Sequence, residues 1–195
     1  LETRRRVSKT RGNLNNELGL PLSILRTGGD AETRPLYRLP HLPTVPFLFT
    51  ATGLGIAESL LGQSIDHIAG AQSQGKRIAE YPTMQMHIAE AAAEIDAARL
   101  VVMRDCASSM AAMGEHKPLT VMERAGNRRG HAYASRLCQG AVDRLFAAAG
   151  AKGLFDSPFA QRKFRDMRAV STHISQNWDR SGTVYGAAAF GLDTV

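Results

Sequence analysis

The sequence has few cysteines, few prolines beyond its first 46 residues, and no long apolar run. Its two cysteines, Cys106 and Cys138, fall on separate helical segments and have neither metal-ligand spacing nor the Cys-x-x-Cys spacing of a redox pair. We interpret them as buried free thiols and expect no bound metal, because an unpaired cysteine commonly packs as a small apolar residue. The longest stretch without an ionisable side chain, 42–57, is shorter than the ~20 residues of a membrane-spanning helix. We therefore expect no transmembrane segment.

The N-terminal region lacks a secretory signal and holds most of the excess positive charge. The arginines at 4–6 are not followed by an apolar core and a small-residue cleavage site, so we place the protein in the cytoplasm. The formal net charge of +6 could suggest nucleic-acid binding. Residues 1–38 contain eight Arg or Lys and four Asp or Glu, which leaves only +2 for the other 157 residues. We expect neither a nucleic-acid partner nor a membrane partner.

The chain divides into an irregular basic arm or linker, 1–46, and a helical bundle, 47–195. The arm is rich in proline and glycine and has no sustained period of 2 or 3.6 residues. After it, short breakers separate long segments with few strand signals. The sequence predicts four helices, over about 47–74, 82–113, 118–149 and from 157 or 158 to 182 or 190.

The second predicted helix carries the clearest pattern in the chain. Its apolar and small residues recur at alternating steps of three and four, which is typical of one buried helix face. Pro82 suits its first turn and Gly114 its end. The predicted stripe consists of Met84, Ile88, Ala91, Ile95, Ala98, Val102, Cys106, Ser109 and Met113.

Four helices joined by short loops favour an all-α, up-and-down four-helix bundle. Each helix of ~30 residues would be ~45 Å long, which suits antiparallel neighbours. The inner faces are rich in alanine and glycine, so the helices can approach closely. Apolar residues left on the outside would be buried by self-association.

Three places could carry chemistry. Unpaired N–H groups around Gly150, with Lys152 beside them, could hold a phosphate, although Gly150 could equally just end a helix. Lys76 and Arg77 follow a predicted helix end, where most such pairs are only solvated charges. His173 can gain or lose a proton near neutral pH, although a lone helical histidine is more often a packed residue.

Two stretches resemble a known superfamily. The segment 81–100, with Pro82, Gln85 and Arg99, is similar to the third bundle helix of the acyl-CoA dehydrogenases. The segment 164–173 resembles the Arg-Asp-x-Arg-x4-His motif of the two-component flavin monooxygenases within that superfamily, with His173 as its histidine. The likeness extends from about residue 35 to the end.

The resemblance implies the C-terminal domain of the oxygenase component of a flavin-dependent monooxygenase. Such enzymes receive reduced FMN or FAD from a separate reductase, add O₂ to it and transfer one oxygen atom to an electron-rich aromatic substrate. By this likeness His173 would hydrogen-bond a substrate phenol, while Arg77, Gly150 and Lys152 would contact the flavin phosphates. Many dehydrogenases have Tyr-Glu-Gly where this chain has His173-Ile174-Ser175, so their catalytic glutamate is missing.

The resemblance also implies a longer protein and an oligomer. The family's N-terminal helical domain and β-barrel have no counterpart in this sequence, so we expect the isolated chain to be inactive. The family's tetramers lead us to expect a homo-oligomer, a dimer or a homotetramer, in addition to the reductase and a small aromatic substrate. Two alternatives remain open: an acyl-CoA dehydrogenase-like oxidoreductase, and a non-catalytic helical oligomerisation module or truncated fragment.

Overall fold

The computed structural model describes residues 39, 41–150 and 158–193, and these residues are overwhelmingly helical. A two-stranded antiparallel hairpin is the only sheet among them. The elements in chain order are α3 (His41–Gly70), β1 (Gln72–Ser73), β2 (Lys76–Arg77), η2 (Ile78–Glu80), α4 (Pro82–Gly114), α5 (Val121–Ala148), α7 (Pro158–Ser171), η3 (Ile174–Gln176) and α8 (Trp178–Ala189).

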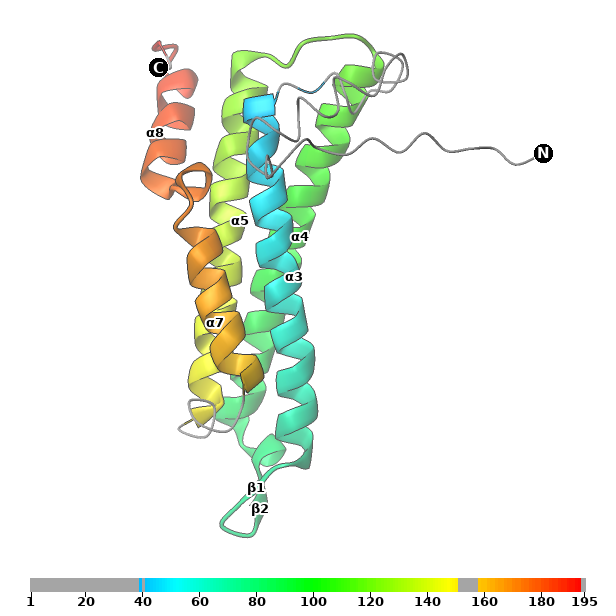
Figure 1. Ribbon diagram of the computed structural model, residues 1–195, viewed down its shortest axis with the longest axis vertical. Helices are drawn as coiled ribbons and strands as arrows, with labels where there is room; N and C mark the ends of the chain where they lie inside the picture. Colours follow the sequence, from blue (N-terminus) through cyan, green and yellow to red (C-terminus); the bar gives the residue numbers. More distant parts are fainter. Residues whose placement is uncertain (1–38, 40, 151–157, 194–195) are drawn as a thin grey trace, which may run out of the picture.

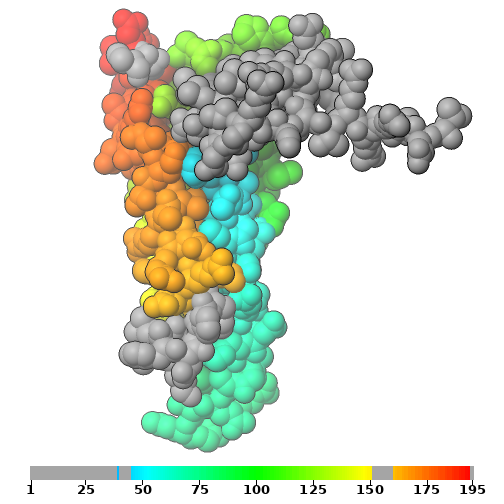
Figure 2. All heavy atoms as spheres, viewed as in Figure 1, coloured from blue at the N-terminus to red at the C-terminus, as the bar shows by residue number. Residues whose placement is uncertain are grey.

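The long helices form an up-and-down bundle, which confirms the predicted all-α class (Figure 1). Helix α5 is central and packs against α3, α4, α7 and α8. Helices α7 and α3 lie side by side on the face shown in Figure 2. The hairpin closes one end of the bundle, and α8 continues along α5 at the other (Figure 1). The division into an arm, 1–46, and a bundle, 47–195, remains a prediction, since residues 1–38 lie outside the described part.

The predicted stripe on α4 is the helix's buried face. Ile95 is 2% exposed and packs in the main apolar cluster with Leu60 and Leu145. Met84 and Ile88 at the start of the stripe and Cys106 nearer its end are half-buried. The remaining members of the stripe are all buried, namely Ala91, Ala98, Val102, Ser109 and Met113.

Small residues let the helices approach closely, as the composition predicted. A Cβ on Gly53 of α3 would lie 3.1 Å from Met167 Cε of α7. A Cβ on Gly130 of α5 would overlap Oδ2 of the buried Asp105 on α4. Burial raises the pKa of the Asp105 carboxyl, while the hydrogen bond from Arg104 opposes that rise.

The two cysteines are free thiols, but only one is fully enclosed. Cys138 is buried, and desolvation raises the pKa of its thiol to about 12. Cys106 is half-buried, and burial raises its pKa as well. Both thiols therefore stay protonated at neutral pH.

The first helix was predicted to run from 47 to 74, and both of its ends are corrected. It begins at His41, because Pro43 falls in the first turn, where no N–H is needed, and the helix tolerates Pro46. It ends at Gly70, and a hairpin follows. Gln74 and Gly75 both have positive φ, 51° and 76°, which suits a tight hairpin turn.

The fourth helix was predicted to be continuous, and this was wrong. Helix α7 ends at Ser171, and a separate helix, α8, begins at Trp178. Polar side chains compete for the backbone at the break: Thr172 Oγ1 donates to Arg168 O at 3.0 Å, and Asn177 caps α8 by accepting from Arg180 N at 2.8 Å.

One segment of α3, Val45–Gly70, is long and apolar enough to cross a membrane by length and composition. The core helix of a bundle meets the same criterion, and α3 packs against α4, α5 and α7. This single segment is weak evidence for a membrane span.

Candidate active site

His173 lies in the break between α7 and α8, not within a helix as the sequence suggested. Its backbone is extended, with φ −62° and ψ 140°, and it caps η3. The ring Nδ1 accepts a hydrogen bond from Ser175 N at 3.2 Å and lies 2.8 Å from Ser175 Oγ. Both of its side-chain hydrogen-bond contacts with described residues are made by Nδ1 and none by Nε2, and the residue is half-buried.

An aromatic contact fixes the plane of this imidazole. The ring of Phe49 on α3 stacks on the His173 ring, with centroids 3.7 Å apart and an interplanar angle of 17°. The histidine is thus held at one nitrogen by η3 and on one face by α3. A ring held in this way offers its remaining nitrogen in a defined direction.

A polar cluster links this histidine to the neighbouring helices. Gln176 and Thr50 are 3% and 0% exposed, and Thr50 Oγ1 lies within hydrogen-bond distance of two acceptors, Pro46 O at 2.8 Å and Gln176 Oε1 at 3.0 Å. Gln176 Nε2 donates to Pro46 O at 3.1 Å and to Ser175 Oγ at 3.2 Å. We refer to Thr50, His173, Ser175, Gln176 and the Pro46 carbonyl as the junction cluster.

A second histidine, His131, lies beside the junction cluster but has no hydrogen-bond partner for its ring among the described residues. It lies on α5 and is completely buried. Its ring meets the edge of Phe47, with centroids 3.8 Å apart. Desolvation lowers the pKa of His131 from 6.5 to about 4, so the ring is neutral at pH 7. It is a core residue.

The second arginine of the Arg-Asp-x-Arg motif, Arg168, links α7 to α5. Arg168 Nη2 donates to both carboxylate oxygens of Asp143 on α5, at 2.9 and 2.7 Å, and its guanidinium lies 5.1 Å from the ring centroid of Phe164. Met167, between the two motif arginines, is fully buried. Arg168 and the buried Met167 therefore both connect α7, the helix that leads to His173, to the rest of the bundle, and Arg168 does so by the expected pairing with a carboxylate across the bundle.

Arg77 and Gly150, which were expected to contact the flavin phosphates, do not belong to the junction cluster. Arg77 is exposed on the hairpin and donates to Ala69 O at 3.4 Å. Gly150 has φ 63° directly after α5, which also suits a helix-ending glycine. Lys152 lies outside the described residues. The hairpin and the end of α5 share one end of the bundle (Figure 1), and His173 follows the far end of α7, which is ~21 Å long.

An apolar groove of about 350 Å³ lies near the hairpin that carries Arg77. Ala69, whose carbonyl oxygen accepts a hydrogen bond from Arg77, lines the groove, and so does Gln85, which donates to Ala79 O at 3.0 Å. The other lining residues are Ile65, Ile68, Ala79, Met84, Ile88, Ala89 and Ala92.

A second hollow, of about 320 Å³, lies between α4, α5 and the start of α8. Trp178 and Tyr133 line it, with ring centroids 5.4 Å apart, and Arg136 lies over the Trp178 ring. The periodicity of α5 gave no sign of this hollow, since α8 completes it. Its remaining lining residues are Val101, Arg104, Arg129 and Gly130.

Sequence reasoning also missed the partners of His173. Ser175, Gln176 and Asn177 form a polar run that disfavours helix and favours turns and caps, and this run was the available signal. Nothing local connects Gln176 with Thr50, 126 residues earlier. Their pairing follows from how α3 and η3 pack.

The fold and the junction cluster together define a class: an up-and-down helical bundle with a histidine-containing polar site at a break in its last helical segment. Residues 47–178 match the family model described as "Acyl-CoA dehydrogenase, C-terminal domain". The chain belongs to this family, which confirms the resemblance seen in the sequence.

The most similar relatives include oxygenases. The chain is 36% identical, over 81% of its length and 41% of the relative's, to "FADH(2)-dependent resorcinol hydroxylase, oxygenase component" of Rhizobium sp. (strain MTP-10005). It is 29% identical to the flavin-dependent monooxygenase oxygenase subunit HsaA of Rhodococcus jostii (strain RHA1), over 87% of this chain and 45% of that protein. The solved HsaA monooxygenase of M. tuberculosis has a TM-score of 0.74 and 30% identity, covering 84% of this chain and 42% of that one. The chain spans less than half the length of these relatives.

Proposed function

We propose that this chain forms the C-terminal helical domain of the oxygenase component of a two-component flavin monooxygenase that hydroxylates a phenolic substrate. The relatives' names support the class of reaction. The observation that carries the proposal is the state of His173. Its Nδ1 is engaged within the chain, while Nε2 has no partner among the described residues.

A bound reduced flavin would supply the oxygen chemistry, and the chain's own residues would orient the substrate. His173 Nε2 would hydrogen-bond the phenolic oxygen and so favour its anionic form, which is the more electron-rich nucleophile. Phe49 and the junction cluster would hold the imidazole in place, so that no reorientation is needed during the reaction.

The dehydrogenase alternative is less well supported by the same site. Removing the α-proton of an acyl thioester needs a positioned base, commonly a carboxylate in this superfamily. The junction cluster contains no carboxylate, and Ile174, which follows His173, is 61% exposed and apolar. We therefore favour the monooxygenase over the dehydrogenase.

The reduced flavin would come from a separate reductase, and we favour FAD over FMN. The resorcinol hydroxylase relative is named as FADH(2)-dependent. Arg77, Gly150 and Lys152 remain proposed contacts for the flavin phosphates. Arg77 and Gly150 belong to the hairpin end of the bundle, whereas His173 follows the other end of α7, so only an elongated molecule could reach both regions.

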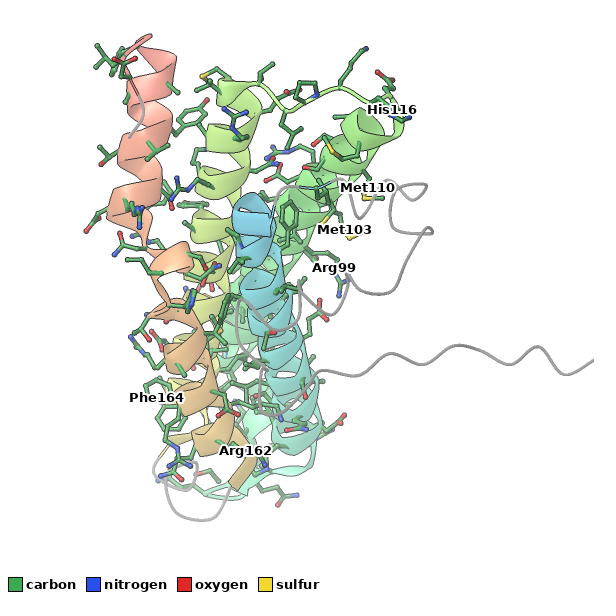
Figure 3. All side chains as sticks on the ribbon, turned by 45° about the horizontal axis from the view of Figure 1, so that its top comes forward. Arg99, Met103, Met110, His116, Arg162 and Phe164 are labelled. Carbon is green, nitrogen blue, oxygen red and sulfur yellow. The ribbon has the colours of Figure 1, made fainter. Side chains whose placement is uncertain are left out.

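The assembly that we propose is a homo-oligomer, a dimer or tetramer, in the cytoplasm. Two large apolar side chains of α4 are solvent-exposed in the single chain: Leu100 is 70% exposed and Met103 is 61% exposed. Figure 3 shows Arg99, Met103 and Met110 following one another along this helix. Burying such a strip against a second copy would remove apolar surface from water.

The test is a pair of His173 variants in the complete oxygenase, assayed with its reductase, a phenol and O₂. His173→Ala should lower product formation by about 10²-fold, the order expected for one lost proton-transfer or hydrogen-bonding group. Flavin affinity should change little, and the oxygen consumed should appear as hydrogen peroxide. Arg162→Ala, on the exposed side of α7, is the matched control. Unchanged coupling of oxygen use to product in His173→Ala would disprove the proposal.

A further inference from the structure

The hydrogen bonds of the junction cluster run in one direction. Thr50 has one hydroxyl hydrogen, the Gln176 amide has two N–H hydrogens and one carbonyl oxygen, and the Ser175 hydroxyl has one hydrogen. The observed contacts join these groups in series from α3 to the imidazole. The orientation of each group therefore depends on the one before it.

The Pro46 carbonyl sets the orientation of the Gln176 amide. A carbonyl oxygen can only accept, so the amide atom 3.1 Å from Pro46 O must be the nitrogen. Reversing the amide would place two oxygens against each other in a site where Gln176 is 3% exposed. The amide oxygen then faces Thr50 Oγ1 at 3.0 Å, and the single hydrogen of that hydroxyl is shared between this oxygen and Pro46 O, 2.8 Å away.

The oriented amide in turn sets the Ser175 hydroxyl. The second N–H of Gln176 donates to Ser175 Oγ at 3.2 Å, so the hydroxyl hydrogen is free to donate elsewhere. The nearest acceptor given by the contacts is His173 Nδ1, 2.8 Å away. The backbone N–H of Ser175 donates to the same nitrogen at 3.2 Å. Since two donors face Nδ1, that nitrogen carries no hydrogen in the neutral ring.

We infer that Thr50, Ser175 and Gln176 are positioning residues that hold neutral His173 as its Nε2–H tautomer. The imidazole then meets its ligand as a hydrogen-bond donor, and the ligand chemistry that fits is an oxygen acceptor such as a phenolate. This rests on the proposed function for the identity of the ligand. The tautomer itself follows from contacts within the chain and can be tested without substrate.

The first experiment measures the tautomer by nitrogen NMR of the ¹⁵N-histidine-labelled chain above pH 8, which is well above the ordinary pKa of a free imidazole. His173→Gln identifies the signals of this ring among the six histidines. The wild type should show Nε2 as the protonated nitrogen, with the Nδ1–H form nearly absent. An equal mixture, or an excess of Nδ1–H, would overturn the inference.

The second experiment removes the hydroxyl group at each end of the hydrogen-bonded series, on Thr50 and on Ser175. Ser175→Ala should raise the Nδ1–H fraction of His173 about fivefold, the order expected for one net hydrogen bond. Thr50→Val should raise it by a smaller, measurable factor, because Pro46 O still orients the Gln176 amide. Thr50→Ser and Ser175→Thr keep the hydroxyls and should restore the wild-type spectrum. The matched controls are Thr52→Val and Ser171→Ala, whose hydroxyls bond Leu48 O and Arg168 O outside the cluster. A spectrum unchanged in either Ser175→Ala or Thr50→Val would overturn the inference.

The third experiment separates this inference from the proposed function. In the complete oxygenase, Thr50→Val should lower the coupling of oxygen use to product without weakening flavin binding, and Thr50→Ser should restore it. If the tautomer behaves as inferred but His173→Ala leaves coupling unchanged, the proposed function fails and the inference stands. If His173→Ala uncouples the enzyme and Thr50→Val changes neither tautomer nor coupling, the inference fails instead.

Discussion

The middle of the bundle and the junction between α7 and α8 are held together by different interactions. In the middle, Leu60, Ile95 and Leu145 have no polar atoms and are at most 2% exposed. At the junction, Thr50 and Gln176 are as deeply buried, but their polar atoms are paired in a directed series. Apolar packing supplies stability without specifying the direction of any group, whereas a paired polar series fixes the direction of each member. We therefore expect changes in the middle to alter stability and changes at the junction to alter chemistry.

The largest expected effect tests the apolar side of this comparison. Ile95→Ala should lower the free energy of unfolding by about 2–5 kcal/mol, because it leaves a cavity in the main core. Denaturant unfolding of the chain measures it. The exposed residue Leu100 on the same helix provides the matched control, and Leu100→Ala should change stability far less. Equal effects of the two substitutions would mean that the faces of α4 are assigned the wrong way round.

A pH titration of stability tests the unpaired histidine beside the junction. Burial lowers the pKa of His131 to about 4, so the unfolded chain takes up a proton below pH 6.5 and the folded chain does not. The free energy of unfolding therefore has its full value above pH 6.5. It decreases as the pH falls from 6.5 towards 4, by up to about 3 kcal/mol in total. Unfolding curves between pH 4 and 7 should show this slope in the wild type, and His131→Phe should reduce it. The same slope in both proteins would contradict the buried neutral state.

A glycine substitution tests the close approach of α4 and α5. Gly130→Ala should destabilise the chain by about 1–3 kcal/mol, because the new Cβ would overlap the buried Asp105 carboxylate. Gly126→Ala lies one turn earlier on α5 with nothing within 4 Å of its Cβ, so it should be neutral or stabilising. Thermal unfolding of the two variants side by side gives the answer. A neutral Gly130→Ala would show that the interface has room to relax.

The smallest expected effect concerns the ion pair that anchors α7. Arg168→Gln should cost only about 0.5–1 kcal/mol, since Arg168 and Asp143 are 46% and 37% exposed and solvent screens the pair. The difference from wild type should shrink further in 1 M salt. A decrease of several kcal/mol in the free energy of unfolding, unaffected by salt, would mean that this ion pair is shielded from solvent in the way that core residues are.

The sequence was sufficient to predict the bundle because its strongest signal is periodic. The stripe from Met84 to Met113 on α4 depends only on spacing, and its central members are buried as expected. The residues at which helices begin and end were harder to predict from the sequence. Pro46 lies inside a helix, and the 72–77 segment forms a hairpin because Gln74 and Gly75 adopt positive φ, which apolar spacing does not encode.

The candidate site was predictable only in part. The motif ending at His173 gave the histidine, and the structure places that residue at a helix break with one ring nitrogen held. Its partners Thr50 and Phe49 come from a helix more than 120 residues earlier, so their positions depend on how α3 packs against η3. The roles of Arg77, Gly150 and Lys152 remain predictions.

The position of the chain's single tryptophan gives the junction an optical reporter. Trp178 is the first residue of α8, two residues after Gln176, and its indole lies 5.4 Å from the Tyr133 ring and beneath the Arg136 guanidinium. Tyrosine excited at this distance transfers its energy to the indole, whose emission wavelength reports the polarity around it. The fluorescence of the unmodified protein would therefore follow whether α8 stays docked on α5 when a reductase, a flavin or a phenol is added, without any label.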